Sequence, residues 1–186
     1  MIEEVKKCAA ILRNGGTILY PTDTIWGIGC DATNEEAVQK IFSIKQRPSS
    51  KSMIILVAYP DQVGFYAETP EVAKDLVEYA ENPLTIIYPK ARGISRLLVA
   101  EDGSIGIRVV KDEFCRMLFN TIRKPLVSTS ANISGEPAPE NFDAISDTIK
   151  SSVDYVVNLR QHETKKVTPS SIIKIGMDGT IEIIRK

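Results

Sequence analysis

A short apolar run that follows a basic, proline-containing segment constrains the fold of this chain more than any other stretch. The run occupies residues 53–57 (Met-Ile-Ile-Leu-Val), and residues 45–51 before it carry three cations around Pro48. Residues 33–44 show the apolar spacing of a helix. Proline ends a helix because it lacks an N–H and clashes with the preceding turn. The sequence therefore predicts a helix, a basic loop and a buried strand in succession.

The three cations of this loop, Lys45, Arg47 and Lys51, leave the predicted helix together. That arrangement suits a polyanion such as a nucleoside triphosphate. The competing interpretation is that Lys and Arg favour the last turn of a helix, where they offset its dipole. This stretch alone leaves both interpretations open.

Similar patterns divide the rest of the chain into short elements. Helices are predicted at residues 2–14, at 33–44 behind a capping box of Thr33 with Glu36, and at 60–66, 70–81, 112–123 and 141–150. Strands are predicted at residues 17–20, 53–58, 84–88, 104–110, 125–129, 153–159, 170–175 and 180–184. Residues 89–103 are basic and irregular, and could form a mobile flap. Because strands and helices do not alternate strictly, we expect an α/β fold with a mixed sheet, in one domain spanning residues 1–186.

Composition narrows the classes of protein to consider. The net charge of −1 and pI of about 5.9 disfavour a large non-specific nucleic-acid surface. The three cysteines are odd in number and form no C-x-x-C, so neither a disulfide framework nor a thiolate metal site is predicted. We see no signal peptide and no apolar run near the ~18 residues that a membrane span requires. A reducing, cytoplasmic location without membrane contact is therefore expected.

Common catalytic and nucleotide motifs are absent from the sequence. His162 is the single histidine and stands in a charged loop, so Ser-His-Asp and Cys-His chemistries lack a base. Neither the P-loop pattern nor G-x-G-x-x-G occurs. If ATP binds, it uses a different cradle.

Three polar loops remain as candidates, and each adjoins a predicted strand. They are residues 21–24, the basic loop 45–51 and residues 130–135. Arg108 stands among the apolar residues of another strand, where its guanidinium could hold a carboxylate in a bidentate fork. Hydroxyl and amide side chains can bind an amino acid, a ribose or a phosphate. Each loop alone could equally reflect turn chemistry.

Four segments together resemble the YrdC-type threonylcarbamoyl-AMP synthase family, and the resemblance covers nearly the whole chain. The segments are residues 21–32, 45–48, 104–108 and 128–135. The family is recognised by Lys-x-Arg followed far downstream by Ser-x-Asn, which here are Lys45-x-Arg47 and Ser130-x-Asn132. The resemblance implies a YrdC-like twisted mixed sheet with flanking helices around a deep, positively lined cavity, in the short single-domain form.

The resemblance also implies an activity and a set of site residues. The reaction joins L-threonine, bicarbonate or CO2, and ATP with Mg²⁺ into threonylcarbamoyl-adenylate, pyrophosphate and water, as a nucleotidyl transfer. Positions that match ATP contacts of the family are Lys45, Arg47, Lys51, Ser104, Ser130, Asn132 and Arg185. Positions that match threonine contacts are Thr24, Arg108, Ser128 and Ser170. No residue is assigned as a catalytic acid, base or nucleophile.

The resemblance further implies partners, and it leaves departures to explain. Short forms rely on partner proteins to transfer the product to adenosine 37 of tRNA. Trp26, Leu56 and Ala138 depart from the residues that are common in the family.

Two alternative interpretations assign the sequence to other functional classes of protein. One is a tRNA or double-stranded RNA binding module, to which Lys90, Arg92 and Arg96 would add local charge. The other is a carbamoyl-transfer domain of hydrogenase maturation, which is normally found in longer chains with zinc-finger-like cysteines.

Overall fold

The computed structural model describes residues 1–46, 53–164 and 168–186, and it shows a mixed α/β architecture. The strands are β1 (Ile18–Tyr20), β2 (Gly27–Gly29), β3 (Ile54–Val57), β4 (Leu84–Tyr88), β5 (Ile105–Val109), β6 (Leu126–Ser130), β7 (Tyr155–Val156), β8 (Ser171–Ile175) and β9 (Ile181–Arg185). The helices are α1 (Ile2–Arg13), α2 (Glu35–Ile44), α3 (Val63–Tyr66), α4 (Glu71–Tyr79), α5 (Glu113–Ile122) and α6 (Asp147–Ser152), with the 3-10 helices η1 (Pro60–Gln62) and η2 (Arg96–Leu98).

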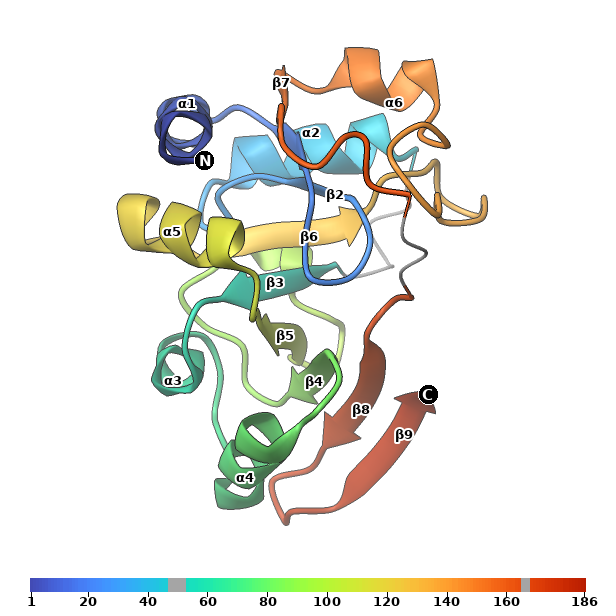
Figure 1. Cartoon of the computed structure of the whole chain (residues 1–186). Coiled ribbons are helices and arrows are strands. Elements are labelled where there is room, and N and C mark those ends of the chain that lie inside the picture. The colour runs from blue at the N-terminus through green and yellow to red at the C-terminus, as the bar shows by residue number, and fades with distance from the viewer. Residues whose placement is uncertain (47–52, 165–167) are drawn as a thin grey trace.

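All strands of the described residues belong to one twisted sheet of nine, in the order β7-β1-β2-β6-β3-β5-β4-β8-β9 (Figure 1). Parallel pairs join β1 to β7, β3 to β5 and β4 to β8, while the other neighbours are antiparallel. The predicted mixed sheet is therefore confirmed. β6 holds the two parts of the sheet together, because it pairs with β2 on one side and with β3 on the other.

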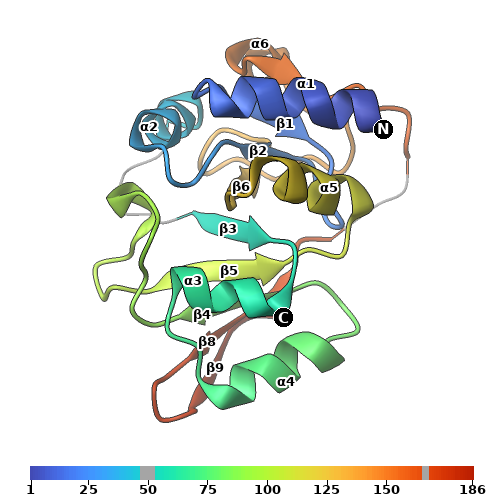
Figure 2. The ribbon, with the colours of Figure 1, turned by 90° about the vertical axis from the view of Figure 1, so that its left-hand side faces the viewer.

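Four helices, α1, α5, α3 and α4, cover one face of this sheet (Figures 1 and 2). The apolar core lies beneath them and includes the fully buried Leu12, Ile55, Ile86 and Leu118. No helix in the described part of the chain has the length and apolar character needed to cross a bilayer.

Two predicted helix boundaries are wrong. α2 begins at Glu35, and Asn34 caps it by accepting a hydrogen bond from the Ala37 N–H at 3.0 Å, so Thr33 is not the cap. Thr33 instead donates to Asp31 in a turn. The helix predicted for 141–150 is reduced to α6, because residues before Asp147 form turns that place Phe142 against Trp26, with ring centroids 4.8 Å apart. Likewise, the strand predicted for 153–159 is only β7.

The segment 89–103 is mostly irregular, as predicted, but it is not loosely held. Leu98 of η2 is fully buried, and the Ser95 N–H donates to the Ala32 carbonyl at 2.9 Å. Arg92 also donates to the carbonyls of Gly64 and Ala67. These contacts anchor the segment to the body of the protein and argue against the mobile flap.

Candidate active site

A cavity of about 260 Å³ lies across the sheet. Its lining residues Thr85 and Arg108 alternate along their strands with the core residues Ile86 and Ile107, so the cavity lies on the face opposite the four helices. β2, β3, β4, β5, β6, β8 and β9 all contribute to its lining, and no described lining residue comes from a helix. The predicted site residues that line it are Thr24, Arg108, Ser128, Ser130, Ser170 and Arg185. A larger, more open groove of about 800 Å³ lies over α2 and contains none of the predicted residues among those described.

Arg108 is the central charge of this cavity and is 3% exposed. It projects from the middle of β5, whose neighbours β3 and β4 place Leu56 and Thr85 opposite it. Its Nη1 donates to Thr24 Oγ1 at 2.9 Å, and its Nη2 lies 3.1 Å from Asp23 Oδ1. That ion pair is close but is not aligned as a hydrogen bond, and the buried Nε has no partner among the described residues. The guanidinium is thus fixed from one side and keeps a donor available.

The loop between β1 and β2 holds Arg108 through a small network of its own. The Thr24 N–H donates to Thr22 Oγ1 at 3.0 Å, and the two threonine hydroxyls lie 3.0 Å apart. Asp23 Oδ2 accepts a hydrogen bond from the Lys111 N–H at 3.1 Å, which ties the loop to the end of β5. The predicted polar loop therefore places Thr24 in the lining of the cavity. Asp23 pairs with Arg108 but is not itself a lining residue.

On the opposite side, Ser170 and Arg185 form a second polar group. Ser170 Oγ lies 2.7 Å from Thr85 Oγ1, and the Ser170 carbonyl accepts from Arg185 Nε and Nη2 at 3.1 and 2.7 Å. Burial, and then the positive charge of Arg108, lowers the pKa of Arg185. The two guanidinium groups thus act on the same space, and both charged residues among the described lining are cationic. An anionic ligand fits such a cavity.

Lys45 connects the basic segment to the Ser130-x-Asn132 loop. It follows α2 directly and is 1% exposed. Its Nζ donates to the carbonyl oxygens of Ser130 and Asn132, at 2.6 Å each. The structure therefore brings the two predicted motifs together, although Lys45 is not among the residues that line the cavity.

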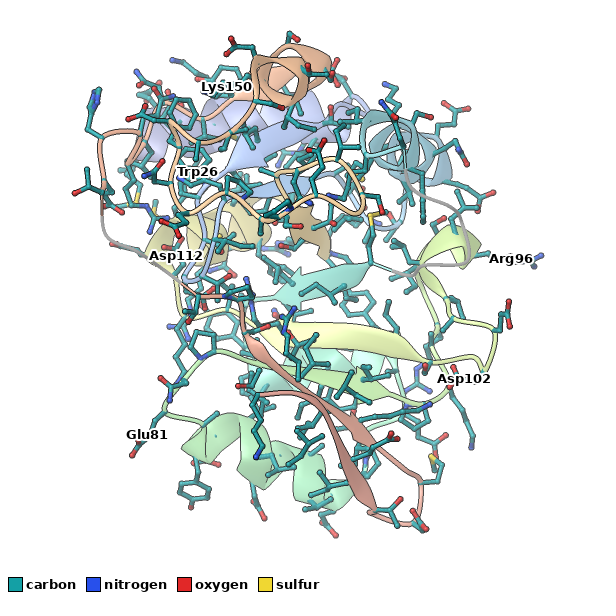
Figure 3. The ribbon with its side chains drawn as sticks, turned by 90° about the vertical axis from the view of Figure 1, so that its right-hand side faces the viewer. Trp26, Glu81, Arg96, Asp102, Asp112 and Lys150 are labelled. Carbon is teal, nitrogen blue, oxygen red and sulfur yellow. The ribbon has the colours of Figure 1, made fainter. Side chains whose placement is uncertain are left out.

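Asn132 and Ser104 lie beside the cavity rather than in its lining. Asn132 Nδ2 donates to the carbonyls of Ile133 and Glu136 at 2.8 Å each, and its Oδ1 is buried without a described partner. Ser104 lines an adjoining groove of about 610 Å³, and its hydroxyl donates to Asp102 at 2.6 Å. Hydrogen bonds from Lys174 first, and then from Ser104, lower the pKa of Asp102 to about 2. Figure 3 views this face of the molecule, with Trp26 and Asp102 on opposite sides of it.

Two predicted residues, Arg47 and Lys51, lie outside the described residues. Of the three departures from the family pattern, Trp26 and Ala138 line the cavity, whereas Leu56 is buried in the core and is not a lining residue.

Sequence reasoning missed several residues that shape the cavity. Thr22 and Asp23 belong to the predicted polar loop but were given no role of their own. Thr85 and Ile54 offered no signal, because each occupies an ordinary position in an apolar strand. No group of three or more His, Cys, Asp and Glu side chains among the described residues is arranged to hold a metal ion.

Comparison with known proteins identifies relatives of this chain. The family model for Sua5, YciO and YrdC, described as telomere recombination, matches residues 10–186. A Methanocaldococcus jannaschii protein is 38% identical over 97% of this chain and 86% of its own length, and its name assigns it provisionally as a threonylcarbamoyl-AMP synthase. A protein of Idiomarina loihiensis named threonylcarbamoyl-AMP synthase is 36% identical over 77% of this chain and 79% of its own length.

Solved structures show the same architecture. Sua5 of P. abyssi in complex with L-threonine superimposes with a TM-score of 0.81 at 27% identity, over 92% of this chain. This chain spans 50% of that Sua5 chain, so it corresponds to about half of the larger protein. YciO of E. coli superimposes with a TM-score of 0.86 over 100% of this chain and 90% of its own, at 23% identity, and shows the likeness of the fold alone.

Proposed function

This chain belongs to the Sua5/YciO/YrdC family, and on that premise we propose that it is an L-threonylcarbamoyladenylate synthase. The reaction would condense L-threonine, bicarbonate or CO2, and MgATP into threonylcarbamoyl-AMP and pyrophosphate, with water released when bicarbonate is the carbon source, and it is a nucleotidyl transfer. The product would serve the threonylcarbamoyl modification of adenosine 37 in tRNA. Two relatives with synthase names, at 38% and 36% identity, support this assignment.

Arg108 is the single observation that carries the proposal. A buried cation whose Nε has no described partner, in a cavity bordered by threonine and serine hydroxyls, is built to receive a carboxylate. Thr24 and Asp23 fix the guanidinium beforehand, so that little freedom is lost when the substrate binds. The proposed substrate therefore places its carboxylate on Arg108 and its hydroxyl among the side chains of Thr24, Ser128 and Ser170.

The nucleotide would occupy the remaining cationic part of the site. Arg185 and Ser130 line the same cavity, and Ser104 lines the adjoining groove, which shares Met53 and Ile54 with it. We place the triphosphate on this side, near the Ser130-x-Asn132 loop that Lys45 contacts. Arg47 and Lys51, which lie outside the described residues, are proposed as further ATP contacts on the strength of the family resemblance alone. Mg²⁺ would arrive with the phosphates and keep most of its water ligands, which needs no cage of protein carboxylates.

Positioning would supply most of the rate. The threonine amine must lose a proton to solvent and combine with CO2, or with bicarbonate, which then releases water. A carbamate oxygen must next attack the α-phosphate in line, so that the bond to the β-phosphate breaks and pyrophosphate leaves. Holding reactants in such an arrangement is worth about 7–11 kcal/mol of the barrier. This mechanism requires no nucleophile from the protein.

One assay tests the proposal. The protein is incubated with ATP, Mg²⁺, bicarbonate and radiolabelled L-threonine, and labelled adenylate and pyrophosphate are separated and counted. We expect both products in equal amounts, and neither when bicarbonate or threonine is omitted. ATP consumption without a labelled adenylate, or equal reaction with L-serine, would refute the assignment.

A further inference from the structure

We propose that Lys45 is a positioning residue, which acts on the nucleotide through the Ser130-x-Asn132 loop and makes no contact with it. The inference depends on the proposed function in one respect, which is that ATP is the ligand used to test it. It differs from the role that the family resemblance implies for Lys45, which is a direct ATP contact.

Two hydrogen bonds of the Lys45 side chain join it to the loop. One ammonium group donates at 2.6 Å to two carbonyl oxygens that are two residues apart, those of Ser130 and Asn132. In return, the Ser134 N–H donates to the Lys45 carbonyl at 2.8 Å. The loop is therefore held at its start, middle and end by one residue. A lysine ammonium has three donors and no acceptor, which suits it to gather carbonyls in this way.

The helix behind Lys45 makes this support rigid. Lys45 is the residue that caps α2, and its N–H donates to the Ile41 carbonyl at 3.0 Å. Cations are favoured at this end of a helix because they offset its dipole. The helix-dipole interpretation of the basic segment thus fits Lys45, which lies at the negative end of the helix and supports the Ser130-x-Asn132 loop from there.

The position of the side chain argues against direct contact with substrate. Lys45 is 1% exposed and does not line the cavity, whereas the neighbouring Ser128 and Ser130 do. Nζ already donates to the Ser130 and Asn132 carbonyls, and a movement of the side chain toward the cavity would lengthen or break these bonds. Buried acceptors that lose their donor are costly, so the bonds to the loop are the favoured state.

The loop in turn controls the orientation of Ser130. The Ala131 N–H of the loop donates to the Trp26 carbonyl at 3.2 Å, and Asn132 Nδ2 donates to the carbonyls of Ile133 and Glu136. Loss of the ammonium would free the two carbonyls on which this turn depends. The Ser130 hydroxyl would then no longer be fixed at the cavity wall.

The test compares Lys45→Met and Lys45→Arg with Lys40→Met as the matched control. Lys40 lies on the same helix and also donates to a backbone carbonyl, that of Gly15 at 3.0 Å, but it is exposed and away from the cavity. Thermal unfolding identifies the variants that fold, and Lys45→Gln replaces any that does not. ATP affinity is measured by calorimetry at several salt concentrations, and amide hydrogen exchange is measured for residues 131–136 without nucleotide.

We expect Lys45→Met to bind ATP about tenfold more weakly or worse, with the same salt dependence as the wild type and with faster exchange in residues 131–136. Lys45→Arg should be equally impaired, because the larger guanidinium does not fit the buried space. Lys40→Met should match the wild type in both measurements.

Three results would overturn the inference. They are a smaller salt dependence in Lys45→Met, as expected when a direct cation–phosphate contact is lost; unchanged exchange in residues 131–136; or ATP affinity retained in Lys45→Arg. If the wild-type protein itself binds no ATP, the proposed function fails, while the exchange measurement still decides the role of Lys45.

Discussion

At the scale of single residues, Arg108 shows how a buried charge is made tolerable and useful. A guanidinium that is 3% exposed needs partners to offset its lost hydration. Thr24 and Asp23 supply them on one side. The Arg108 Nε has no partner among the residues that the structure describes, and this donor marks the direction from which a further acceptor is expected. The burial of the guanidinium therefore both costs hydration free energy and enables this residue to bind an anion.

Replacement of Arg108 by Ala should weaken threonine binding far more than ATP binding. Hydrogen bonds to a charged group contribute about 1.5–3 kcal/mol, so the dissociation constant for threonine should rise by about 10–100-fold, while that for ATP changes little. Calorimetric titration of each substrate measures both. Arg116→Ala serves as the control, because Arg116 donates to the Val110 carbonyl and packs over Tyr59 away from the cavity. Equal losses for both substrates would mean that Arg108 is not the carboxylate clamp.

The sequence predicted Arg108 and Thr24 but not their neighbour Asp23. An arginine among apolar strand residues stands out, and so does a polar loop that follows a strand. The pairing of Asp23 with Arg108 depends on bringing together the β1–β2 loop and β5, which are far apart in the chain. Thr85 contributes for the same reason, since only the register of β4 against β5 places it opposite Arg108.

At the scale of secondary-structure elements, apolar periodicity and capping residues predicted most helices correctly, but they did not predict where every helix begins and ends. α5 begins where the helix was predicted to begin, and Asp112 caps it by accepting a hydrogen bond from the Cys115 N–H at 2.9 Å. α2 and α6 were misplaced because Thr33 and Asn141 also have side chains that stabilise turns. Competing local hydrogen bonds of this kind are decided by packing, as with Phe142 against Trp26, which periodicity alone does not reveal.

The end of α5 offers a prediction about stability. Arg123 caps this helix in the left-handed region, with φ of 55°, which glycine adopts without strain. Arg123→Gly should therefore stabilise the protein by about 0.5–1 kcal/mol. Thermal unfolding measures the gain. Asn14→Gly is the matched control, because Asn14 ends α1 with φ of −89° and should gain nothing. A lower melting temperature for Arg123→Gly would show that its side chain contributes more than the strain costs.

At the scale of the whole molecule, the class of the sheet was predictable but the order of its strands was not. Periodicity indicates which residues form strands, whereas their neighbours are set by long-range pairing. β6 illustrates this, because it follows β5 in the chain yet pairs with β2 and β3. β2 is not among the predicted strands, and two of its three residues are the glycines that flank Ile28. It lies between β1 and β6, so that close approach of the backbone is what the two glycines permit.

A substitution at Gly29 tests whether the two parts of the sheet fold as one unit. A Cβ at this position would lie 2.5 Å from the Val127 carbonyl oxygen and 2.6 Å from a ring carbon of Tyr20, so β2 and β6 would have to separate. Gly29→Ala should destabilise the protein by about 2–3 kcal/mol, which lowers its melting temperature by about 5–10 °C.

Gly64→Ala is the control, because nothing lies within 4 Å of the place that an added methyl group would take on α3, and alanine favours a helix. Both variants should unfold in one transition, since β6 belongs to both parts of the sheet and neither part can keep its core without it. A second transition in Gly29→Ala, seen by calorimetry, would mean that residues 1–186 fold as two units, with the cavity between them dependent on their association.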